Sequence, residues 1–410
     1  MKRYVIIGNG VAAAGCIEGI RSVDGTGEIT VVSEEKHAVY CRPLISYYLE
    51  GKTDLSRMNY RSEDYYERMG CRVLYGCRAV RLLPDLRQVV LDNGTALPYS
   101  ALCLATGSSP FAPAFAGLDS VPKKYSFLTL DDALALEQGI DPSSRVLIVG
   151  AGLIGLKCAE GIAARVASVT VCDLADRVLS SILDAECAAW MQRHLEQHGL
   201  RFHLSDSVAR FDGNTAYLQS GAAVPFDVLV LAVGVRANTS LLKEIGGDVN
   251  RGILVDDRMR TSVDGIYAAG DCTEGWDSSI GQRRVLAILP NASLQGHTAG
   301  VNMAGGSKSF DNAIPMNSIG FFGLHAMTAG ICTGEMYEEK TGQSLKRLFT
   351  EDDLLKGFIL IGGSERAGIY TSLIREKTPL SSINFDLLKK TATTAAFSPE
   401  KRRKTFGGVV

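Results

Sequence analysis

Residues 145–155 read RVLIVGAGLIG, and a near copy, RYVIIGNGVAA, occupies residues 3–13. In each stretch a run of apolar residues leads into a glycine-rich turn, and a segment of helix-forming residues follows. This order predicts a buried strand, a tight turn and a helix. A second strand is expected after each helix, at EITVVS (28–33) and at SVTVCD (168–173). The chain is therefore predicted to be an α/β protein in which one parallel strand–helix–strand unit occurs twice.

The first glycine turn has the residues that bring a backbone close to a phosphate. Gly8 permits the tight turn, Gly10 leaves room for a pyrophosphate, and the small Ala13 lets helix and strand pack closely. Backbone N–H groups at the start of the helix then face the phosphates. Glu34 follows the second strand, where an acid is expected to hold the ribose hydroxyls. A strand–turn–helix without a ligand is the alternative for one such motif alone.

The second turn carries a full GxGxxG motif at Gly150, Gly152 and Gly155. Asp173 ends the following strand, and an acid there repels a 2′-phosphate and favours NADH. Arg177 lies nearby and could accept that phosphate, so NADPH stays an alternative. Because two motifs occur in one chain, we expect two Rossmann-like dinucleotide-binding domains.

A third motif follows a further buried strand, predicted at residues 265–269, which ends in Gly270-Asp271. A carboxylate there lies at the carboxyl edge of the sheet, where open α/β sheets bind ligands. Other strands are expected at 72–75, 87–92 and 227–233, and helices at 62–69 and 293–305. Beyond residue 310, strand-like segments at 317–334 and 358–363 and a helix at 365–376 predict a C-terminal α+β domain.

The composition of the 410 residues excludes several classes of protein. Hydrophobic residues make up 46% and charged residues 21%, the balance of a folded globular protein. The net charge of −2 does not favour nucleic-acid binding. No apolar run reaches the roughly 20 residues of a membrane span, and no signal peptide is recognised, so a cytoplasmic protein is expected. The ten cysteines contain no CxxC pair, so neither a metal site nor an iron–sulfur cluster is expected.

These motifs, with Ala105-Thr106-Gly107 after a strand, resemble the pyridine nucleotide–disulfide oxidoreductase superfamily over residues 1–305. The resemblance implies FAD in the first unit and NAD(H) in the second. The implied FAD residues are Gly8, Gly10, Ala13, Glu34, Arg42, Ala105, Thr106, Gly107, Gly270 and Asp271. The implied NAD residues are Gly150, Gly152, Gly155, Asp173 and Gly234.

The motif order also implies a domain order. Glu34 and Asp271 must reach the same FAD, so the FAD-binding domain is expected to be split between residues 1–122 and 238–310. The NAD-binding domain, 123–237, lies between these parts. Residues 311–410 are expected to form an interface domain for dimerisation or partner docking.

The segment Tyr40-Cys41-Arg42-Pro43-Leu44-Ile45-Ser46 resembles the YxRPxLS stretch of NADH:rubredoxin and ferredoxin reductases. This layout also resembles the FAD subunits of tungsten aldehyde oxidoreductase complexes. By this resemblance Arg42 contacts FAD and Pro43 borders the isoalloxazine ring. The CxxxxC pair of the disulfide reductases is absent, which disfavours disulfide reduction.

Two positions depart from that branch. Tyr47 replaces a lysine that follows the serine in several relatives, and Lys157 replaces its glutamate partner. We hypothesise that Lys157 places a positive charge near the flavin; the alternative is a pair with Glu160 or a solvent-exposed lysine. Cys41 falls near the region where NADH oxidases and peroxidases carry a peroxidatic thiol, but it occupies the variable position of YxRP and the SCG context of those enzymes is missing.

The expected function is the transfer of electrons between NADH and a protein carrier such as rubredoxin, ferredoxin or an iron–sulfur subunit. Three alternatives stay open: an NADH oxidase or peroxidase using Cys41, a redox-sensing flavoprotein with little turnover, and a complex subunit that is inactive alone. His194 and His198 have a metal-ligand spacing but favour an amphipathic surface helix. Residues 401–404 are basic and form either a solvated tail or a docking arm for an acidic carrier.

Overall fold

The computed structural model describes residues 1–111, 113–363 and 366–405. The chain divides into two compact units. Unit 1 comprises Met1–Gly275 and Arg283–Phe310, and unit 2 comprises Trp276–Gln282 and Asp311–Val410. The expected boundaries between the FAD and NAD domains, near residues 122 and 237, lie inside unit 1, and the domain assignment stays a prediction.

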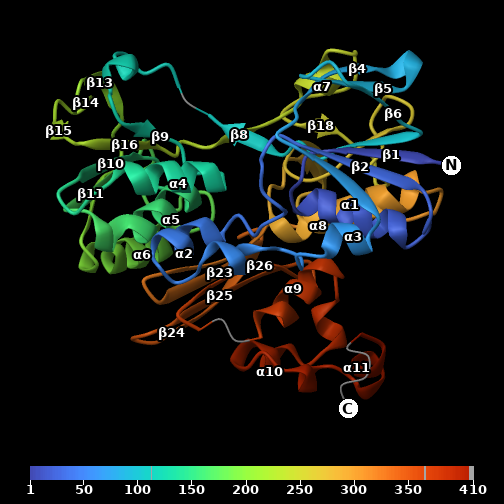
Figure 1. Ribbon diagram of the computed structural model, residues 1–410. Coiled ribbons are helices and arrows are strands. Elements are labelled where there is room, and N and C mark those ends of the chain that lie inside the picture. The colour runs from blue at the N-terminus through green and yellow to red at the C-terminus, as the bar shows by residue number, and fades with distance from the viewer. Residues whose placement is uncertain (112, 364–365, 406–410) are drawn as a thin grey trace. The chain divides into compact units, whose positions relative to one another are not determined.

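The first parallel sheet of unit 1 has the strand order β19-β7-β1-β2-β3 (Figure 1). Its strands are β1 (Arg3–Ile7), β2 (Glu28–Ser33), β3 (Cys71–Tyr75), β7 (Ala101–Leu104) and β19 (Ile266–Ala268). The runs of buried aliphatic residues in β1, β2 and β7 suit a parallel sheet that is covered on both faces. Helices α1 (Val11–Arg21) and α8 (Leu289–Met303) pack closely together, and a Cβ at Gly296 would lie 2.0 Å from the Ala12 carbonyl oxygen.

The second parallel sheet has the order β12-β11-β10-β16-β9. Its strands are β9 (Lys124–Tyr125), β10 (Arg145–Val149), β11 (Ser168–Cys172), β12 (Leu200–His203) and β16 (Val228–Leu231). Helices α4 (Leu130–Gly139), α5 (Leu153–Ile162) and α6 (Ala185–Gln197) belong to this part of the chain. The strand–turn–helix–strand unit therefore occurs twice, and the predicted fold class is confirmed.

Smaller elements complete residues 1–310. One three-stranded sheet contains β4 (Ala79–Leu83), β5 (Gln88–Leu91) and β6 (Ala96–Pro98), and another contains β13 (Val208–Asp212), β14 (Thr215–Leu218) and β15 (Ala223–Pro225). Strands β8 (Ser108–Pro110) and β17 (Val235–Ala237) pair antiparallel. A third small sheet contains β18 (Ile253–Leu254), β20 (Thr273–Asp277) and β21 (Gln282–Arg284). The remaining short helices are α2 (Leu44–Leu49), α3 (Tyr65–Arg68) and α7 (Ser240–Lys243).

Unit 2 is built on an antiparallel sheet of order β22-β23-β26-β25-β24. Its strands are β22 (Met316–Phe321), β23 (Leu324–Gly330), β24 (Glu335–Lys340), β25 (Leu345–Glu351) and β26 (Leu354–Ile361). Helices α9 (Ala367–Arg375), α10 (Phe385–Lys390) and α11 (Pro399–Thr405) follow. A core that includes Leu348, Phe358 and Tyr370 joins the sheet to α9.

Several expected element bounds were wrong. The helix expected at 62–69 is confined to Tyr65–Arg68, whereas the strand-like segment expected at 317–334 is confirmed as the two strands β22 and β23. Helix α8 begins at Leu289, four residues earlier than expected, because Pro290 is tolerated in the first helical turn. Among the described residues, no helix combines the length and apolar character that a membrane crossing needs.

Candidate active site

The first glycine turn, between β1 and α1, is crowded against the sheet and open on its other side. Gly8 has a φ of +107°, and a Cβ there would lie 2.0 Å from the carbonyl oxygen of Ala105. Its N–H donates to Val32 O at 2.8 Å and ties the turn to β2. At Gly10, apart from the glycine itself and its two chain neighbours, no heavy atom of the described residues lies within 4 Å of the place a Cβ would take. This open space at the N-terminus of α1 fits a pyrophosphate.

The second glycine turn, between β10 and α5, has the same asymmetry. Gly150 has a φ of +120°, and a Cβ there would lie 2.2 Å from Ala232 O. A Cβ at Gly155 would meet Gly150 O at 2.0 Å, so the helix packs directly on the turn. Gly152 faces open space within the described part of the chain. This turn therefore also offers backbone N–H groups and room for a phosphate.

Asp173, the acid expected to contact the ribose, lies after β11 and is bonded to the second turn. Its Oδ2 accepts from the N–H of Ala151 at 2.6 Å, and its Oδ1 accepts from the N–H of Ala175 at 2.8 Å. Gly234 follows β16 with a φ of +116°. Residues 150–152, 173 and 234 thus lie at the carboxyl ends of adjacent strands, where such sheets bind ligands.

Asn9, between the two glycines of the first turn, has a structural role that the motif did not indicate. Tyr66 Oη donates to Asn9 Oδ1 at 2.7 Å, and Asn9 Nδ2 donates to His37 O at 3.2 Å. Tyr66 Oη also accepts from the N–H of Val39 at 3.1 Å. Burial raises the pKa of Tyr66 to about 12, so its hydroxyl stays protonated and remains a donor. Asn9 therefore holds the turn against the segment that follows β2.

The two acids after β2 have different surroundings. Glu34 is exposed at the strand end, in the position expected for a ribose contact. Glu35 instead accepts from Tyr40 Oη at 2.7 Å and forms an ion pair with Arg42. Arg42 also donates to Leu128 O at 3.2 Å. Glu35 thus positions the arginine that the resemblance assigns to FAD, a role that no sequence motif indicated.

Asp271 and Arg42 are brought together, although they are far apart in the sequence. Burial raises the pKa of the Asp271 carboxyl, and the positive charge of Arg42 opposes that rise. The preceding Gly270 has a φ of +85°, and its N–H donates to Gln295 Oε1 at 2.9 Å. The turn that presents Asp271 is therefore held by α8.

The Ala105-Thr106-Gly107 run is joined to the segment after β17 by reciprocal bonds. Thr106 Oγ1 donates to Asn238 O at 2.8 Å, and Asn238 Nδ2 donates to Thr106 O at 2.8 Å. Ser109 Oγ donates to Asn238 Oδ1 at 2.8 Å. These bonds and the antiparallel β8–β17 pair hold together the two segments of chain that connect the parallel sheets of unit 1.

Cys41 and Pro43 lie just before α2. Burial raises the pKa of the Cys41 thiol, so at neutral pH it is in its neutral, weakly nucleophilic form. Pro43 is exposed at the N-cap of α2. The neutral thiol disfavours the peroxidase alternative.

Lys157, on α5, forms an ion pair with Glu160, and both side chains are largely buried. Its Nζ lies 4.5 Å from the centroid of the Tyr47 ring, which adds a cation–π contact. The structure therefore contains the Glu160 pair that was the alternative at sequence level. The proximity of Lys157 to a flavin stays a prediction.

Helix α2, which follows the YCRP segment, is tied to the second half of unit 1. Tyr48 Oη donates to Glu137 Oε2 at 2.7 Å, and Arg165 Nη1 donates to Glu137 Oε1 at 2.8 Å. Arg165 also donates to Leu49 O at 3.1 Å. The helix therefore connects the predicted FAD and NAD sites through side chains of α4 and of the residues after α5.

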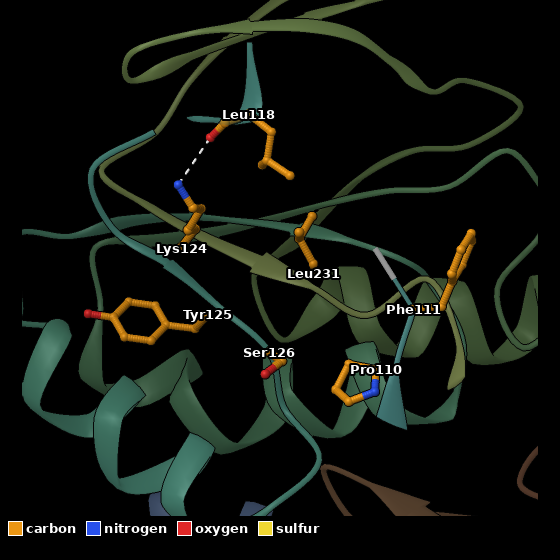
Figure 2. Close-up of a pocket in the computed structure, with 7 residues that line it drawn as sticks. All are labelled: Pro110, Phe111, Leu118, Lys124, Tyr125, Ser126 and Leu231. Atoms are coloured by element: carbon orange, nitrogen blue, oxygen red, sulfur yellow. Dashed lines mark hydrogen bonds between the residues drawn. The ribbon is translucent and has the colours of Figure 1, made fainter. Parts of the chain in front are cut away.

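A pocket of about 300 Å³ lies at the carboxyl ends of β9 and β16 (Figure 2). Lys124 Nζ donates to Leu118 O at 3.3 Å on one side of it. The lining residues are Pro110, Phe111, Leu118, Lys124, Tyr125, Ser126 and Leu231. These residues come from β8, β9, β16 and the loops beside them, and none belongs to a recognisable sequence motif.

The remaining sequence candidates lie outside this site. The rings of His194 and His198 have centroids 4.5 Å apart, and His198 Nδ1 is 2.8 Å from His194 O. Residues 401–403 belong to α11, and the side chain of Lys404 lies outside the described residues. Their role as a docking arm stays a prediction.

Comparisons with known proteins agree with this geometry. Residues 2–296 match a family model described as "Pyridine nucleotide-disulphide oxidoreductase". The chain is 33% identical, over 93% of both chains, to "NADH-dependent phenylglyoxylate dehydrogenase subunit epsilon" of Aromatoleum evansii. It is 31% identical to "Assimilatory nitrate reductase electron transfer subunit" of Bacillus subtilis (strain 168), over 92% of this chain and 50% of that protein.

Solved structures extend the likeness in fold to the C-terminal part. The crystal structure of a covalent putidaredoxin reductase–putidaredoxin complex matches with a TM-score of 0.86. The match covers 100% of this chain and 99% of the other, at 22% identity. At that identity the match describes the fold, from the first parallel sheet to the C-terminal helices.

Proposed function

This chain belongs to the pyridine nucleotide-disulphide oxidoreductase family, and we propose on that basis that it moves electrons between NADH and a protein electron carrier. It is an FAD- and NAD(H)-dependent oxidoreductase. The observation that carries the proposal is the pair of glycine turns in unit 1, each closed toward its sheet and open at Gly10 or Gly152.

The residues of the chain bind and orient the two nucleotides. When bound, FAD supplies the two-electron chemistry that links a hydride donor to a carrier. The N–H groups after Gly10 face the FAD pyrophosphate, Glu35 fixes the direction of Arg42, and Asp271 accepts hydrogen bonds from a polyol. The turn at Gly152 would hold the pyrophosphate of NADH, and Asp173 would accept hydrogen bonds from its ribose. Positioning is the main contribution of the protein, since hydride transfer needs no protein acid or base.

A protein acceptor is favoured over a small oxidant for two reasons. The sequence has no CxxxxC pair to receive electrons as a disulfide. Burial raises the pKa of the Cys41 thiol, so this residue is a poor peroxidatic nucleophile at neutral pH. Both features disfavour a cysteine as the acceptor, and the electrons are proposed to pass from the flavin to a partner protein.

The acceptor is tested by supplying carriers to the purified, FAD-loaded protein. Rubredoxin and a [2Fe–2S] ferredoxin are each mixed anaerobically with NADH and protein, and their visible absorbance is followed. Oxygen uptake and peroxide consumption are measured in parallel. We expect carrier reduction to exceed oxygen uptake. Rapid oxygen or peroxide turnover without carrier reduction would instead support an NADH oxidase or peroxidase.

A second candidate is a subunit that works only within a complex. The match to the phenylglyoxylate dehydrogenase epsilon subunit favours it, because it covers 93% of both chains. Native purification separates the two candidates. A co-eluting polypeptide with iron–sulfur absorbance, whose removal abolishes NADH turnover, supports the subunit. A single polypeptide that reduces added carriers supports a free-standing reductase.

The finer parts of this proposal concern domains, compartment and assembly. We assign FAD binding to residues 1–122 and 238–310 and NAD(H) binding to residues 123–237. We assign partner docking, or the formation of an oligomer, to residues 311–410. The cytoplasm is the proposed compartment, where NADH and reduced carriers are both available.

A further inference from the structure

The segment after β11 forms an arc whose two ends are bonded to the same residue of the second glycine turn. The N–H of Ala151 donates to Asp173 Oδ2 at 2.6 Å. The carbonyl oxygen of Ala151 accepts from the N–H of Leu179 at 3.0 Å. The N–H of Ser205 donates to Ala175 O at 2.8 Å and fixes the middle of the arc. The arc is therefore held beside the turn, where the adenosine ribose of a dinucleotide lies in such domains.

Asp176 and Arg177 lie on this arc and are bonded to each other. Arg177 Nη1 donates to Asp176 Oδ1 at 2.7 Å, and its Nε donates to Leu183 O at 3.3 Å. The Arg177 side chain is 33% exposed and that of Asp176 is 66% exposed, so a ligand on the arc can reach both. A guanidinium near the end of this strand is the group that accepts the 2′-phosphate of NADPH. Here that guanidinium is already occupied.

We infer that Asp176 is a coenzyme-selectivity residue that acts through Arg177. By pairing with the guanidinium, Asp176 withholds from the site the cation that would otherwise bind a 2′-phosphate. The arc then presents two carboxylates, Asp173 and Asp176, against one guanidinium. Its net charge of about −1 repels a phosphate dianion and leaves the ribose hydroxyls of NADH unopposed.

This inference deepens the proposed function and depends on it, because it requires a dinucleotide at the turn around Gly152. It differs from the motif-based expectation. The presence of Asp173 alone did not decide between NADH and NADPH, since Arg177 could have accepted the 2′-phosphate. The Asp176 pair removes that ambiguity.

The test measures binding of the non-reacting probes NAD+ and NADP+ to the FAD-loaded full-length protein by calorimetry at low ionic strength. The variants are D176A, D176E, R177A and D176A/R177A. D212A is the matched control. It removes an equally exposed acid that pairs with Arg210 on β13.

D176A is expected to lower the ratio of the NADP+ to the NAD+ dissociation constant by about tenfold, the worth of one charge-assisted hydrogen bond. D176E and D212A are expected to keep the wild-type ratio of dissociation constants. In D176A/R177A the stronger NADP+ binding gained in D176A is expected to disappear. An unchanged ratio in D176A, or a gain that survives in the double variant, overturns the inference while leaving NAD+ binding and the proposed function intact. Failure of the wild-type protein to bind either nucleotide overturns both.

Discussion

At the scale of single residues, the two glycines of each turn have opposite surroundings. Gly8 and Gly150 adopt positive φ angles, and a Cβ at either would meet a backbone carbonyl oxygen at 2.0 or 2.2 Å. Gly10 and Gly152 have no described atom within 4 Å of a Cβ position. The first pair is therefore needed to form the turn, and the second pair is needed to admit a ligand.

This difference predicts separable effects in the second turn. Gly152→Ala is expected to fold, to keep FAD and to weaken NAD+ binding at least about tenfold, because its Cβ enters the space of the pyrophosphate. Gly150→Ala is expected to lower the unfolding midpoint markedly, because the backbone itself must shift. Calorimetry with NAD+ and a thermal melt measure the two effects. Wild-type NAD+ affinity in Gly152→Ala would show that this turn does not hold the dinucleotide.

The residues of the site were predictable where a motif fixes chemistry to a position. The glycines, Asp173 and Asp271 lie at the carboxyl ends of their strands, as their motifs require. Asn9 and Glu35 were not predictable, because each acts through partners that folding places beside it. Arg177 was named from the sequence, but its pairing with the adjacent Asp176 depends on side-chain directions that no motif indicates. A polar residue between two motif glycines was the one available signal for Asn9.

At the scale of elements, helix α5 carries a buried ion pair whose charges cancel. Lys157→Gln would remove the positive charge that faces the Glu160 carboxylate on the helix that begins at the NAD turn. If this pair lies near the flavin, as we hypothesise, the excess negative charge disfavours reduction. We expect the two-electron midpoint potential to fall by about 30 mV, which equals roughly 1.4 kcal/mol.

The matched variant Lys157→Gln/Glu160→Gln removes both charges and is expected to restore the potential. Spectroelectrochemical titration of the FAD-loaded proteins gives the values. Equal potentials in the wild type, the single variant and the double variant would place the pair outside the electrostatic reach of the flavin.

Two neighbouring strands of the second sheet, β10 and β16, are joined at their start by a pH-sensitive ion pair. Arg145 donates to both oxygens of Asp227 at 2.9 Å and lowers the pKa of that carboxyl to about 2. Because the native state favours the ionised carboxylate, its stabilising effect is complete above the ordinary pKa of 3.8 and is lost as the pH falls toward 2. Both side chains are more than a third exposed, so solvent screening keeps the effect small.

Asp227→Asn is therefore expected to destabilise the protein by about 1 kcal/mol or less at pH 7. The difference between the denaturant midpoints of the wild type and of Asp227→Asn should narrow as the pH falls below 4. Denaturant titrations at pH 7, 5 and 3.5 measure it. A gap that stays constant over this range would assign the loss to packing rather than to the charge of Asp227.

Element types followed from the sequence more reliably than their bounds. Buried aliphatic runs predicted the central strands of both parallel sheets, because such strands are covered on both faces. The charged edge strand β24 and its neighbour β25 were missed, since Glu335–Lys340 shows no apolar alternation. Edge strands carry such charges, which prevent pairing with other chains, so their sequences resemble loops.

At the scale of the whole molecule, the duplicated strand–turn–helix–strand unit, together with Ala105-Thr106-Gly107 and Gly270-Asp271, predicted family, fold class and cofactors, and these predictions are confirmed. The electron acceptor could not be read in the same way. It is selected by the surface of the folded protein, where no local spacing of residues reports the shape or charge of a partner. The acceptor and the roles of residues 311–410 therefore remain proposals.

The most direct test of the account is an anaerobic titration of the FAD-loaded protein with NADH, followed by the flavin absorbance. One hydride carries two electrons, so about one equivalent of NADH per FAD is expected to bleach the flavin completely. A requirement for about two equivalents would reveal a second two-electron centre, make Cys41 the candidate and contradict the account. A flavin that NADH does not bleach would contradict it equally.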